Sequence, residues 1–521
     1  MKKAIYKVIQ IIFILLIQST LGYIWAEKQE EPVLELTIEE AIEKAVLNNA
    51  QIEEARLQWI ISDLNVKAEW GQFEPLITTN YEINEVNTKD TTINIFQPIE
   101  DKDYKATTED YSIGIEGNTL FGGLYNVGYN VNKEENSNSE ENDFTSFIGV
   151  TFKQPILKGF TRNTPFTRMR IARRDRLIAF HKYRKTLMEI IAQVETAYWN
   201  LVLAQEQHKM AIESLDIAKS MVEDANERFI AGKMSQMDLY ESEAGMAIRE
   251  FYKSDAYQNV LDAMVRLKLL LTDGFTEKDL MIVAIDSLIS DTIDSLSLNQ
   301  DASIEFAMKS QPDYIIYTTE IEKEKILLDY LKDQSLPELN ITGSCGFSGF
   351  GNTIEESIAQ MTDQYYPTWT LKFDFSIPLF MGLRQQSELA AGKIKKEIRE
   401  KQLKTVKTQL VNSIVLLFQY SNSVNIRIEN IQNVVSVKKR ILDVELSRME
   451  AGMSNTRLVY EAEEELSDAR KEELETMLNY REIMSQLALI RGSILSERKL
   501  ENVVNNRFIL SDNLTTQNNL E

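Results

Sequence analysis

The stretch LMEIIAQVETAYWNLVLAQEQHKMAIESLDIAKSMVEDANERFIAG, residues 187–232, decides the fold of this chain. It carries a seam of mostly apolar or small residues in steps of three and four, held over six heptads: Leu187, Ile190, Val194, Ala197, Leu201, Ala204, His208, Ala211, Leu215, Ala218, Val222, Ala225 and Phe229. Such a seam predicts a long helix that packs closely against another helix.

A glycine ends this predicted helix, and the chain then turns back. Gly232 can adopt the left-handed backbone that closes a helix, and helix-forming residues resume at Met237. The predicted unit is therefore a helical hairpin with Gly232 at its tip.

The hairpin occurs twice in the sequence. Residues 220 positions apart match around the tip, namely Arg228 with Arg448, Ala231 with Ala451, Gly232 with Gly452, Tyr240 with Tyr460, Glu241 with Glu461 and Glu243 with Glu463. A second set of matches, 262 positions apart, pairs Ile42 with Ile304 and Pro75 with Pro337. The chain is therefore predicted to be a tandem duplication.

The N-terminus has the pattern of an export signal. Lys2 and Lys3 precede an apolar run over 8–17, and small and polar residues follow as far as Ala26. This order predicts a secretory signal peptide over 1–26. No later segment is long and apolar enough for a transmembrane helix, so any membrane span of the mature chain is expected to be β-structured.

After Pro75 the sequence period changes from helical to two. Apolar and polar residues alternate in several runs within 75–157 and again within 337–380. Strands with one apolar and one polar face are typical of a lipid-facing barrel with a wet interior. A soluble sandwich with one buried face fits the alternation equally well, but the signal peptide favours the barrel. Residues 109–133 predict an additional hairpin, which either joins the barrel wall or lies outside it.

The two repeats have the same order of parts. The predicted segments are a first repeat over 27–272 with helices 37–70, 161–231 and 233–272, a linker over 273–298, a second repeat over 299–499 with helices 299–332, 383–451 and 453–497, and a tail over 500–521. In each repeat one long helix matches two shorter helices stacked end to end. Four helical columns and at least four strands are too few to close a useful bore, so several copies must surround one axis.

Composition excludes several classes of function. A net charge of −23 and a pI near 4.8 argue against a nucleic-acid binder. Cys345 is the single cysteine, so an intramolecular disulfide is impossible, and His181 and His208 are too few for a histidine-based metal site. No phosphate-binding loop, nucleophile elbow or paired carboxylates stand out. We therefore predict no catalytic, cofactor-binding or metal-binding residue and no enzyme.

Several phrases together resemble the TolC-like outer-membrane efflux proteins of Gram-negative bacteria. They are LTIEEAI at 36–42, QPILKGF at 154–160, AYWNL at 197–201 and RFIAG at 228–232. The resemblance implies an α+β membrane protein that assembles as a homotrimer in outer-membrane lipid. Four strands per chain would form a twelve-stranded barrel, and twelve helical columns would form a coiled-coil tunnel across the periplasm.

The resemblance also implies which residues act at the helical tips. The tip residues, which would contact a periplasmic adaptor linked to an inner-membrane pump, are Ala231, Gly232, Lys233, Ala451, Gly452 and Met453. Acidic residues six and nine positions beyond the second tip glycine ring the closed entrance in the family, and here those positions hold Leu458 and Glu461. Asp238 keeps the acid at the equivalent place in the first repeat. A solvated helix face is the alternative interpretation of Glu461.

The function expected from these features is an outer-membrane exit duct for efflux or type I secretion, without a cofactor. The alternative is a structural coiled-coil protein of the cell envelope with a soluble β-domain. Ion conductance would distinguish the two, because only the duct encloses a water-filled path.

Overall fold

A computed structural model describes residues 33–89, 103–136, 143–160, 164–271, 281–288, 299–378, 382–451 and 453–501. The predicted signal peptide, the tip residue Gly452 and nearly all of the predicted tail lie outside these ranges. The chain divides into two compact units. We call them the helical unit, which holds described residues from 33–53, 186–307 and 412–501, and the sheet unit, which holds those from 54–185 and 308–411.

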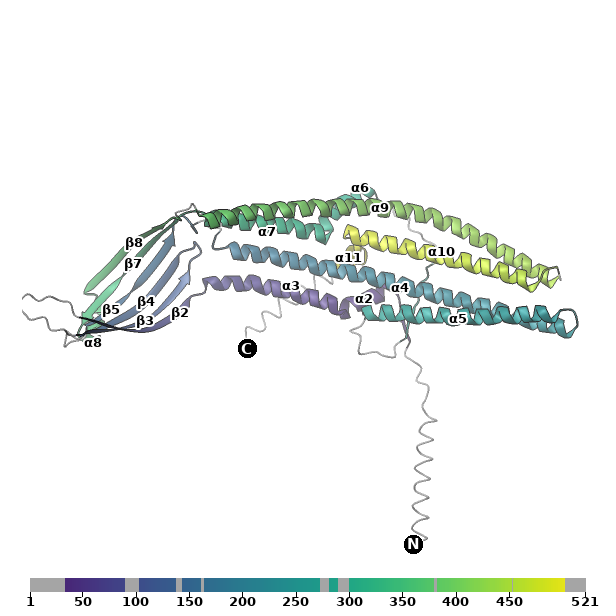
Figure 1. The fold of residues 1–521 in the computed structure, drawn as a ribbon, viewed down its shortest axis with the longest axis horizontal. Coiled ribbons are helices and arrows are strands. Elements are labelled where there is room, and N and C mark those ends of the chain that lie inside the picture. The colour runs from purple at the N-terminus through teal and green to yellow at the C-terminus, as the bar shows by residue number, and fades with distance from the viewer. Residues whose placement is uncertain are drawn as a thin grey trace, which may run out of the picture. The chain divides into compact units, whose positions relative to one another are not determined.

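The helical unit is built from two helical hairpins: α4 turns back into α5, and α9 turns back into α10 (Figure 1). Its elements, whole or in part, are β1 (Val33–Leu36), α2 (Ile38–Asn48), the first turn of α3 (Ala50–Ala68), α4 (Thr167–Ile230), α5 (Gln236–Leu271), β6 (Met281–Ala284), α6 (Gln300–Ser310), α9 (Leu383–Glu450), α10 (Thr456–Arg491) and α11 (Ile494–Glu497). Strands β1 and β6 pair in parallel, so the predicted linker contributes one short strand, which pairs with β1.

The predicted heptad seam forms the buried side of α4 in this unit. Leu187, Val194, Leu201 and Ala218 are all at most 1% exposed. His208, the polar member of the seam, is only partly buried, and its ring centroid lies 5.4 Å from that of Tyr257. The seam is therefore buried along much of α4, but its last member, Phe229, is 37% exposed near the tip.

Helix caps divide two segments, 37–70 and 299–332, that were each predicted as a single helix. Thr37 and Glu40 form the expected capping box at the start of α2, with Glu40 accepting from the Thr37 N–H at 2.9 Å. The range 37–70 is then interrupted at Asn49, whose side chain accepts from the Gln51 N–H at 3.0 Å. Pro312 similarly starts α7 within 299–332, because proline suits the first turn of a helix better than its interior.

The sheet unit contains a six-stranded sheet in the order β2-β3-β4-β5-β7-β8, and every neighbouring pair is antiparallel (Figure 1). Its elements, besides parts of α4, α6 and α9, are α3 (Ala50–Ala68), the 3-10 helix η1 (Glu69–Phe73), β2 (Leu76–Lys89), β3 (Asp103–Asn118), β4 (Leu124–Asn136), β5 (Asp143–Pro155), α7 (Pro312–Gln334), β7 (Glu338–Gly351), α8 (Ile354–Thr362) and β8 (Tyr366–Ser376).

The additional hairpin predicted over 109–133 is β3 and β4, and it lies inside this sheet between β2 and β5. The resemblance implied four strands for the chain, and that number is wrong, because six strands pair continuously. The physical reason is that β3 and β4 keep the period-two alternation of their neighbours, so they extend the same ladder.

The two faces of the sheet differ sharply in polarity. Cross-strand partners share a face, and one row of them is apolar: Ile77, Ile115, Val127, Val150, Cys345 and Trp369. The neighbouring row on the opposite face is Thr78, Gly114, Gly128, Gly149, Gly346 and Thr368. Ile77 is 78% exposed and Trp369 is 76% exposed. The apolar face therefore has little protein packed against it at the two edge strands.

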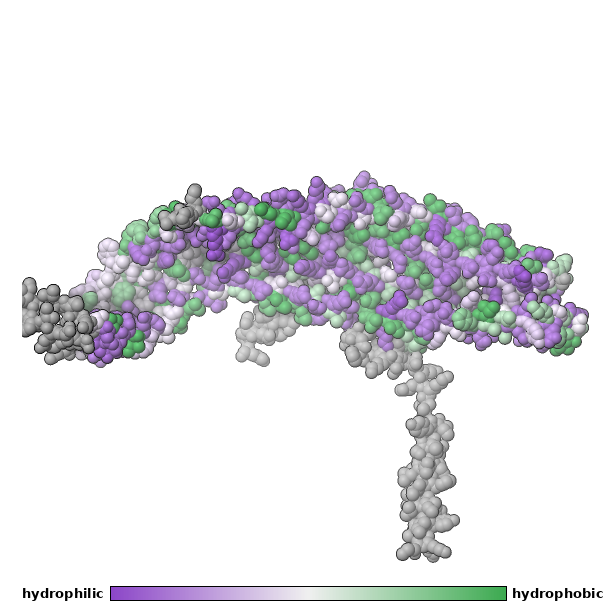
Figure 2. All heavy atoms as spheres, in the orientation of Figure 1, coloured by the Kyte–Doolittle hydropathy of each residue, from purple (hydrophilic) through white to green (hydrophobic). Residues whose placement is uncertain are grey.

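The visible surfaces of the long helices mix polar and apolar residues. Figure 2 shows hydrophilic and hydrophobic residues interspersed along the visible side of α9 and α10. Within the described residues, no helix combines the length and the apolar character that crossing a bilayer requires.

Candidate channel entrance at the helical tips

The first tip has the turn that the sequence predicted. Gly232 has φ +68°, a left-handed backbone, and the Lys233 N–H donates to the Arg228 carbonyl at 2.8 Å. A Cβ at Gly232 would meet nothing within 4 Å, so the glycine is required by the backbone and not by crowding. Ile230 is 77% exposed and Ala231 is exposed beside it, so the tip presents apolar surface.

The second tip repeats this pattern of hydrogen bonds. The Met453 N–H donates to the Arg448 carbonyl at 2.8 Å, and the Ala451 N–H donates to the Ser447 carbonyl at 3.2 Å. Met453 is 66% exposed. The two tips also contact each other, because Arg228 donates to the Met449 carbonyl at 3.4 Å.

Asp238, the candidate acid of the first repeat, serves as a helix cap. The Ser235 N–H donates to its carboxylate at 3.3 Å, and the Asp238 N–H donates to the Ser235 hydroxyl at 3.2 Å. This reciprocal pair is a capping box at the start of α5. Asp238 is partly buried, so its carboxylate has a structural role whatever it does at an entrance.

Leu458 occupies the matching position of the second repeat and cannot complete such a box. The Asn455 side chain caps α10 alone, accepting from the Leu458 N–H at 3.0 Å. Leu458 is 42% exposed. The acid that the resemblance implied for this place is therefore absent, and an apolar side chain stands there.

Glu461 lies one turn further along α10 and pairs within its own helix. Arg457 Nε lies 2.9 Å from Glu461 Oε1, and the two side chains are 75% and 51% exposed. The hydrogen bond to Glu461 raises the pKa of Arg457 above its usual range. Within the described residues Glu461 has no hydrogen bond to Asp238, and its partner is Arg457.

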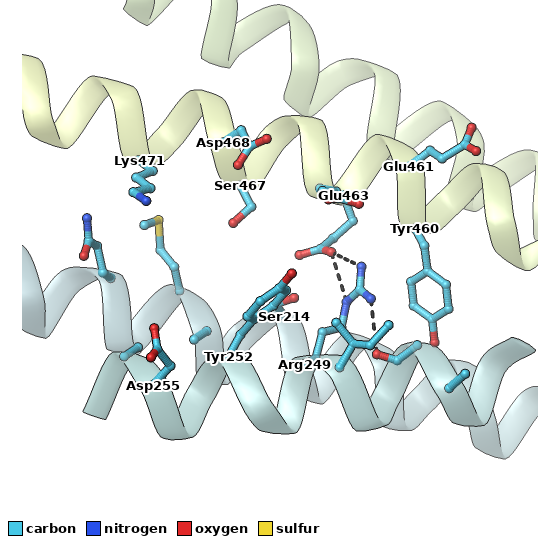
Figure 3. Close-up of a pocket in the computed structure, with 18 of the residues that line it drawn as sticks. Ser214, Arg249, Tyr252, Asp255, Tyr460, Glu461, Glu463, Ser467, Asp468 and Lys471 are labelled. Atoms are coloured by element: carbon cyan, nitrogen blue, oxygen red, sulfur yellow. Dashed lines mark hydrogen bonds and ion pairs between the residues drawn. The ribbon is translucent and has the colours of Figure 1, made fainter. Parts of the chain in front are cut away.

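A buried ion pair further along the same helices was not predicted from the sequence. Arg249 of α5 donates through Nη2 and Nε to Glu463 Oε2 of α10, at 2.5 Å and 3.1 Å (Figure 3). The two residues are 8% and 7% exposed. Removing one partner of such a buried pair strands the other charge and costs about 3–5 kcal/mol.

Tyr460 and Gly245 enclose this ion pair. The Arg249 guanidinium carbon lies 4.1 Å from the centre of the Tyr460 ring, and the Tyr460 hydroxyl donates to the Ser242 carbonyl at 3.2 Å. A Cβ on Gly245 would overlap the Tyr460 ring, so only glycine allows the ring to lie against α5. Burial raises the pKa of Tyr460, so its hydroxyl stays protonated at neutral pH.

The duplication supplied part of the signal for this cluster. Tyr460 and Glu463 match Tyr240 and Glu243, but the residue 220 positions after Arg249 is Ala469. An arginine four residues after a glycine, in one repeat only, was the available hint. Pattern alone could not show which of the matched glutamates is buried.

A groove of about 630 Å³ lies between α4, α5 and α10 beside the ion pair. Its charged lining comprises Glu241, Asp255, Glu461, Glu463, Glu464 and Asp468 with Arg249, Arg457 and Lys471 (Figure 3). The excess of carboxylates favours positively charged groups in the groove.

Among the residues that the structure describes, no three His, Cys, Asp or Glu side chains are grouped to hold a metal ion. Burial lowers the pKa of His181 to about 4, so that ring is neutral at pH 7.

Comparison with known proteins places the chain in a family. A model of the family described as "Outer membrane efflux protein" matches residues 124–272 and 328–493, which together exceed half of the chain. The chain is 20% identical to the outer membrane protein TolC of Vibrio cholerae over 380 residues, covering 70% of this chain and 81% of TolC. It is 21% identical over 251 residues to the proteases secretion protein PrtF of Dickeya chrysanthemi, covering 47% of this chain and about half, 51%, of PrtF.

Solved structures show the same fold. The outer-membrane channel OprN superposes with a TM-score of 0.65 at 12% identity, covering 88% of this chain and 90% of that one. The family comprises channel and transport proteins, and the alternative of a purely structural coiled-coil protein is not favoured. The repeated tips, the two-faced sheet and these matches lead to one conclusion: the chain belongs to the outer membrane efflux protein family and is an outer-membrane protein that extends into the periplasm.

Proposed function

We propose that three copies of this chain form a closed exit duct for efflux or type I secretion. The strands line a barrel in the outer membrane, and the helical hairpins form the tunnel below it. The observation that carries the proposal is the sheet with one exposed apolar face and one polar face. A row of exposed apolar side chains across six strands favours a non-aqueous neighbour, and lipid on one side with water on the other suits both faces. The helix α8 covers part of the apolar face at β5, where the Ser146 hydroxyl donates to the Ser357 carbonyl.

The free edges of the sheet support assembly from several copies. β2 and β8 each have a neighbouring strand on one side only, so one row of backbone N–H and C=O groups on each lacks a partner in the sheet. Within a bilayer these groups must be paired, because no water is available to them. Pairing of β8 with β2 of the next copy satisfies both rows at once.

The ion pair of Arg249 with Glu463 supports a closed resting state of the tunnel. This ion pair joins α5 of the first hairpin to α10 of the second, near the tips. Opening requires the hairpins to separate, and separation would break a buried, charge-assisted contact. Three groove linings rich in carboxylate around one axis would make the path cation-preferring.

The tips support docking to partners. Ala231, Lys233 and Met453 are exposed at the turns, where an adaptor protein can reach them and connect the duct to an inner-membrane transporter. PrtF is described as a proteases secretion protein, which supports secretion of polypeptides as one form of the activity. The energy for transport comes from the partners, and the duct itself is passive.

Reconstitution in planar bilayers tests this function. The purified full chain should run as a trimer in mild detergent and insert as discrete channels, with cations carrying most of the current. Heat-denatured protein at the same concentration is the control. A monomer that gives no conductance steps, even after the Glu463→Ala change, would contradict the proposal.

A further inference from the structure

The number of strands in the sheet sets the width of any wall built from it. The chain contributes six paired strands, where the resemblance implied four. The two additional strands are β3 and β4, which form a hairpin between β2 and β5. The hairpin either belongs to the barrel wall or projects from it. The two cases differ in whether its side chains continue the apolar row and the glycine row of the neighbouring strands.

The apolar row runs through the hairpin without a break. Ile115 and Val127 stand between Ile77 of β2 and Val150 of β5. All four side chains are between 42% and 78% exposed, so in this row the hairpin has the same exposed apolar face as the strands beside it. Further along the same face Val131 of β4 is buried, and α8 packs over part of β5, where the Ser146 hydroxyl donates to the Ser357 carbonyl at 2.9 Å. A soluble hairpin projecting into water would not need that face.

The glycine row on the polar face also runs through the hairpin. A Cβ on Gly114 would lie 3.2 Å from the Cα of Gly128, and a Cβ on Gly128 would lie 3.1 Å from the Ile113 carbonyl oxygen. In β5, a Cβ on Gly149 would lie 2.6 Å from the Cys345 carbonyl oxygen. Glycines at such close approaches accompany bends in curved sheets. The hairpin therefore carries the same backbone crowding on the polar face as the strands that follow it.

The direction of the strands allows rotational closure. The six strands alternate in direction, so the two edges, β2 and β8, run oppositely. Copies related by rotation about one axis then meet as β8 against β2 in an antiparallel pair. An even number of strands in each copy permits this antiparallel pairing of β8 with β2. Bacterial transmembrane barrels are antiparallel throughout, so the pairing is the one that closure requires.

We infer that the barrel of this protein has eighteen strands, six from each of three copies, with β3 and β4 as full members of its wall. This inference rests on the proposed trimeric duct. Barrel diameter grows roughly linearly with strand number, so the bore is about 1.5 times that of a twelve-stranded wall. Barrels of about 16–18 strands leave an open aqueous channel, so the outer end admits bulkier polar cargo than a twelve-stranded exit.

Cryo-electron microscopy of the trimer in nanodiscs counts the strands directly. Wild-type protein should show eighteen, and a variant lacking residues 103–136 should show twelve, with a diameter about two thirds as large. β2 and β5 run in opposite directions, so they can pair once the hairpin is removed. A trimeric wild-type wall of twelve strands, with the hairpin outside it, would overturn the inference and leave the duct intact.

Thiol labelling in the full chain tests the same point without a deletion. In a Cys345→Ser background, a membrane-impermeant maleimide should label Asn130→Cys on the polar face of β4 and leave Ile115→Cys on the apolar face of β3 unlabelled. Thr151→Cys and Val150→Cys on β5 are the matched controls. Equal labelling of the two hairpin thiols, with a normal difference on β5, would overturn the inference alone. Equal labelling on β5 as well would overturn the proposed duct.

Discussion

The two helical hairpins share a backbone hydrogen bond at their tips and differ in the charged contacts of their matching glutamates. The bond from Lys233 to Arg228 in the first repeat has its counterpart from Met453 to Arg448 in the second, both at 2.8 Å. Yet Glu243 is exposed, whereas its match Glu463 is 7% exposed and paired with Arg249.

Packing explains why Glu243 is exposed and its match Glu463 is buried. One side of α10 enters an apolar core with α4 and α9, formed by Met221, Leu442, Met449, Val459, Ala462 and Leu466. Glu463 lies on the neighbouring side of α10, where α5 covers it and Arg249 pairs with it. The duplication thus accounts for the two hairpins. The different surroundings of the two copies account for the ion pair of Arg249 with Glu463, which joins them.

The largest expected effect comes from breaking the buried pair on one side only. Glu463→Ala should destabilise the packing of α5 on α10 by about 3–5 kcal/mol, because Arg249 remains buried without its partner. Hydrogen exchange of the amides in α5 and α10 measures the loss. The matched control Glu243→Ala should change exchange by no more than about 0.5 kcal/mol. Similar effects at the two positions would refute the asymmetry.

Filling the space at Gly245 should have the next largest effect. Gly245→Ala places a Cβ into the Tyr460 ring, and overpacking of this kind costs about 1–3 kcal/mol. The exchange rates in α10 report it. In a Tyr460→Ala background the same substitution should cost much less, and additive costs would show that the ring is not the cause.

Exchanging the caps should alter the two tips in opposite directions by smaller amounts. Asp238→Leu removes half of a capping box and should destabilise the start of α5 by about 1 kcal/mol. Leu458→Asp gives α10 a carboxylate at the matching position and should stabilise its start by a similar or smaller amount. Exchange in the first turn of each helix measures both. A change of the same sign in both variants would contradict the role assigned to the caps.

The smallest effect on stability is expected at Glu461. Its pair with Arg457 is exposed, so Glu461→Ala should cost about 0.3–0.5 kcal/mol. Its effect on ion selectivity should be larger, because three copies would converge on one axis. Reversal potentials in a salt gradient measure this. An unchanged cation preference would leave Glu461 as a solvated helix residue.

Much of this architecture could be read from periodicity. The heptad seam ending at Gly232 predicted the first hairpin, and residue matches 220 positions apart predicted the second. Alternation after Pro75 predicted strands. These features are local, so a one-dimensional pattern records them.

Features that depend on contacts between distant segments could not be predicted in this way. Register placed β3 and β4 inside the sheet, and nothing in residues 109–133 alone distinguishes that from a projecting hairpin. Arg249 is polar and its matching residue is Ala469, so pattern gave no reason to bury it. The helix break at Asn49 arises partly from a bond to the Leu270 carbonyl, far along the chain.

We propose that three copies of the chain enclose a conducting path, which is held shut between the two hairpins of each copy. Single-channel recording of the Glu463→Ala trimer, beside Glu243→Ala and the unaltered chain, tests it most directly. We predict cation-preferring channels. Relative to the unaltered chain, their conductance or open time should rise severalfold in Glu463→Ala and stay unchanged in Glu243→Ala. Equal currents in all three proteins would contradict the role assigned to the ion pair, and no current in any of them would contradict the duct.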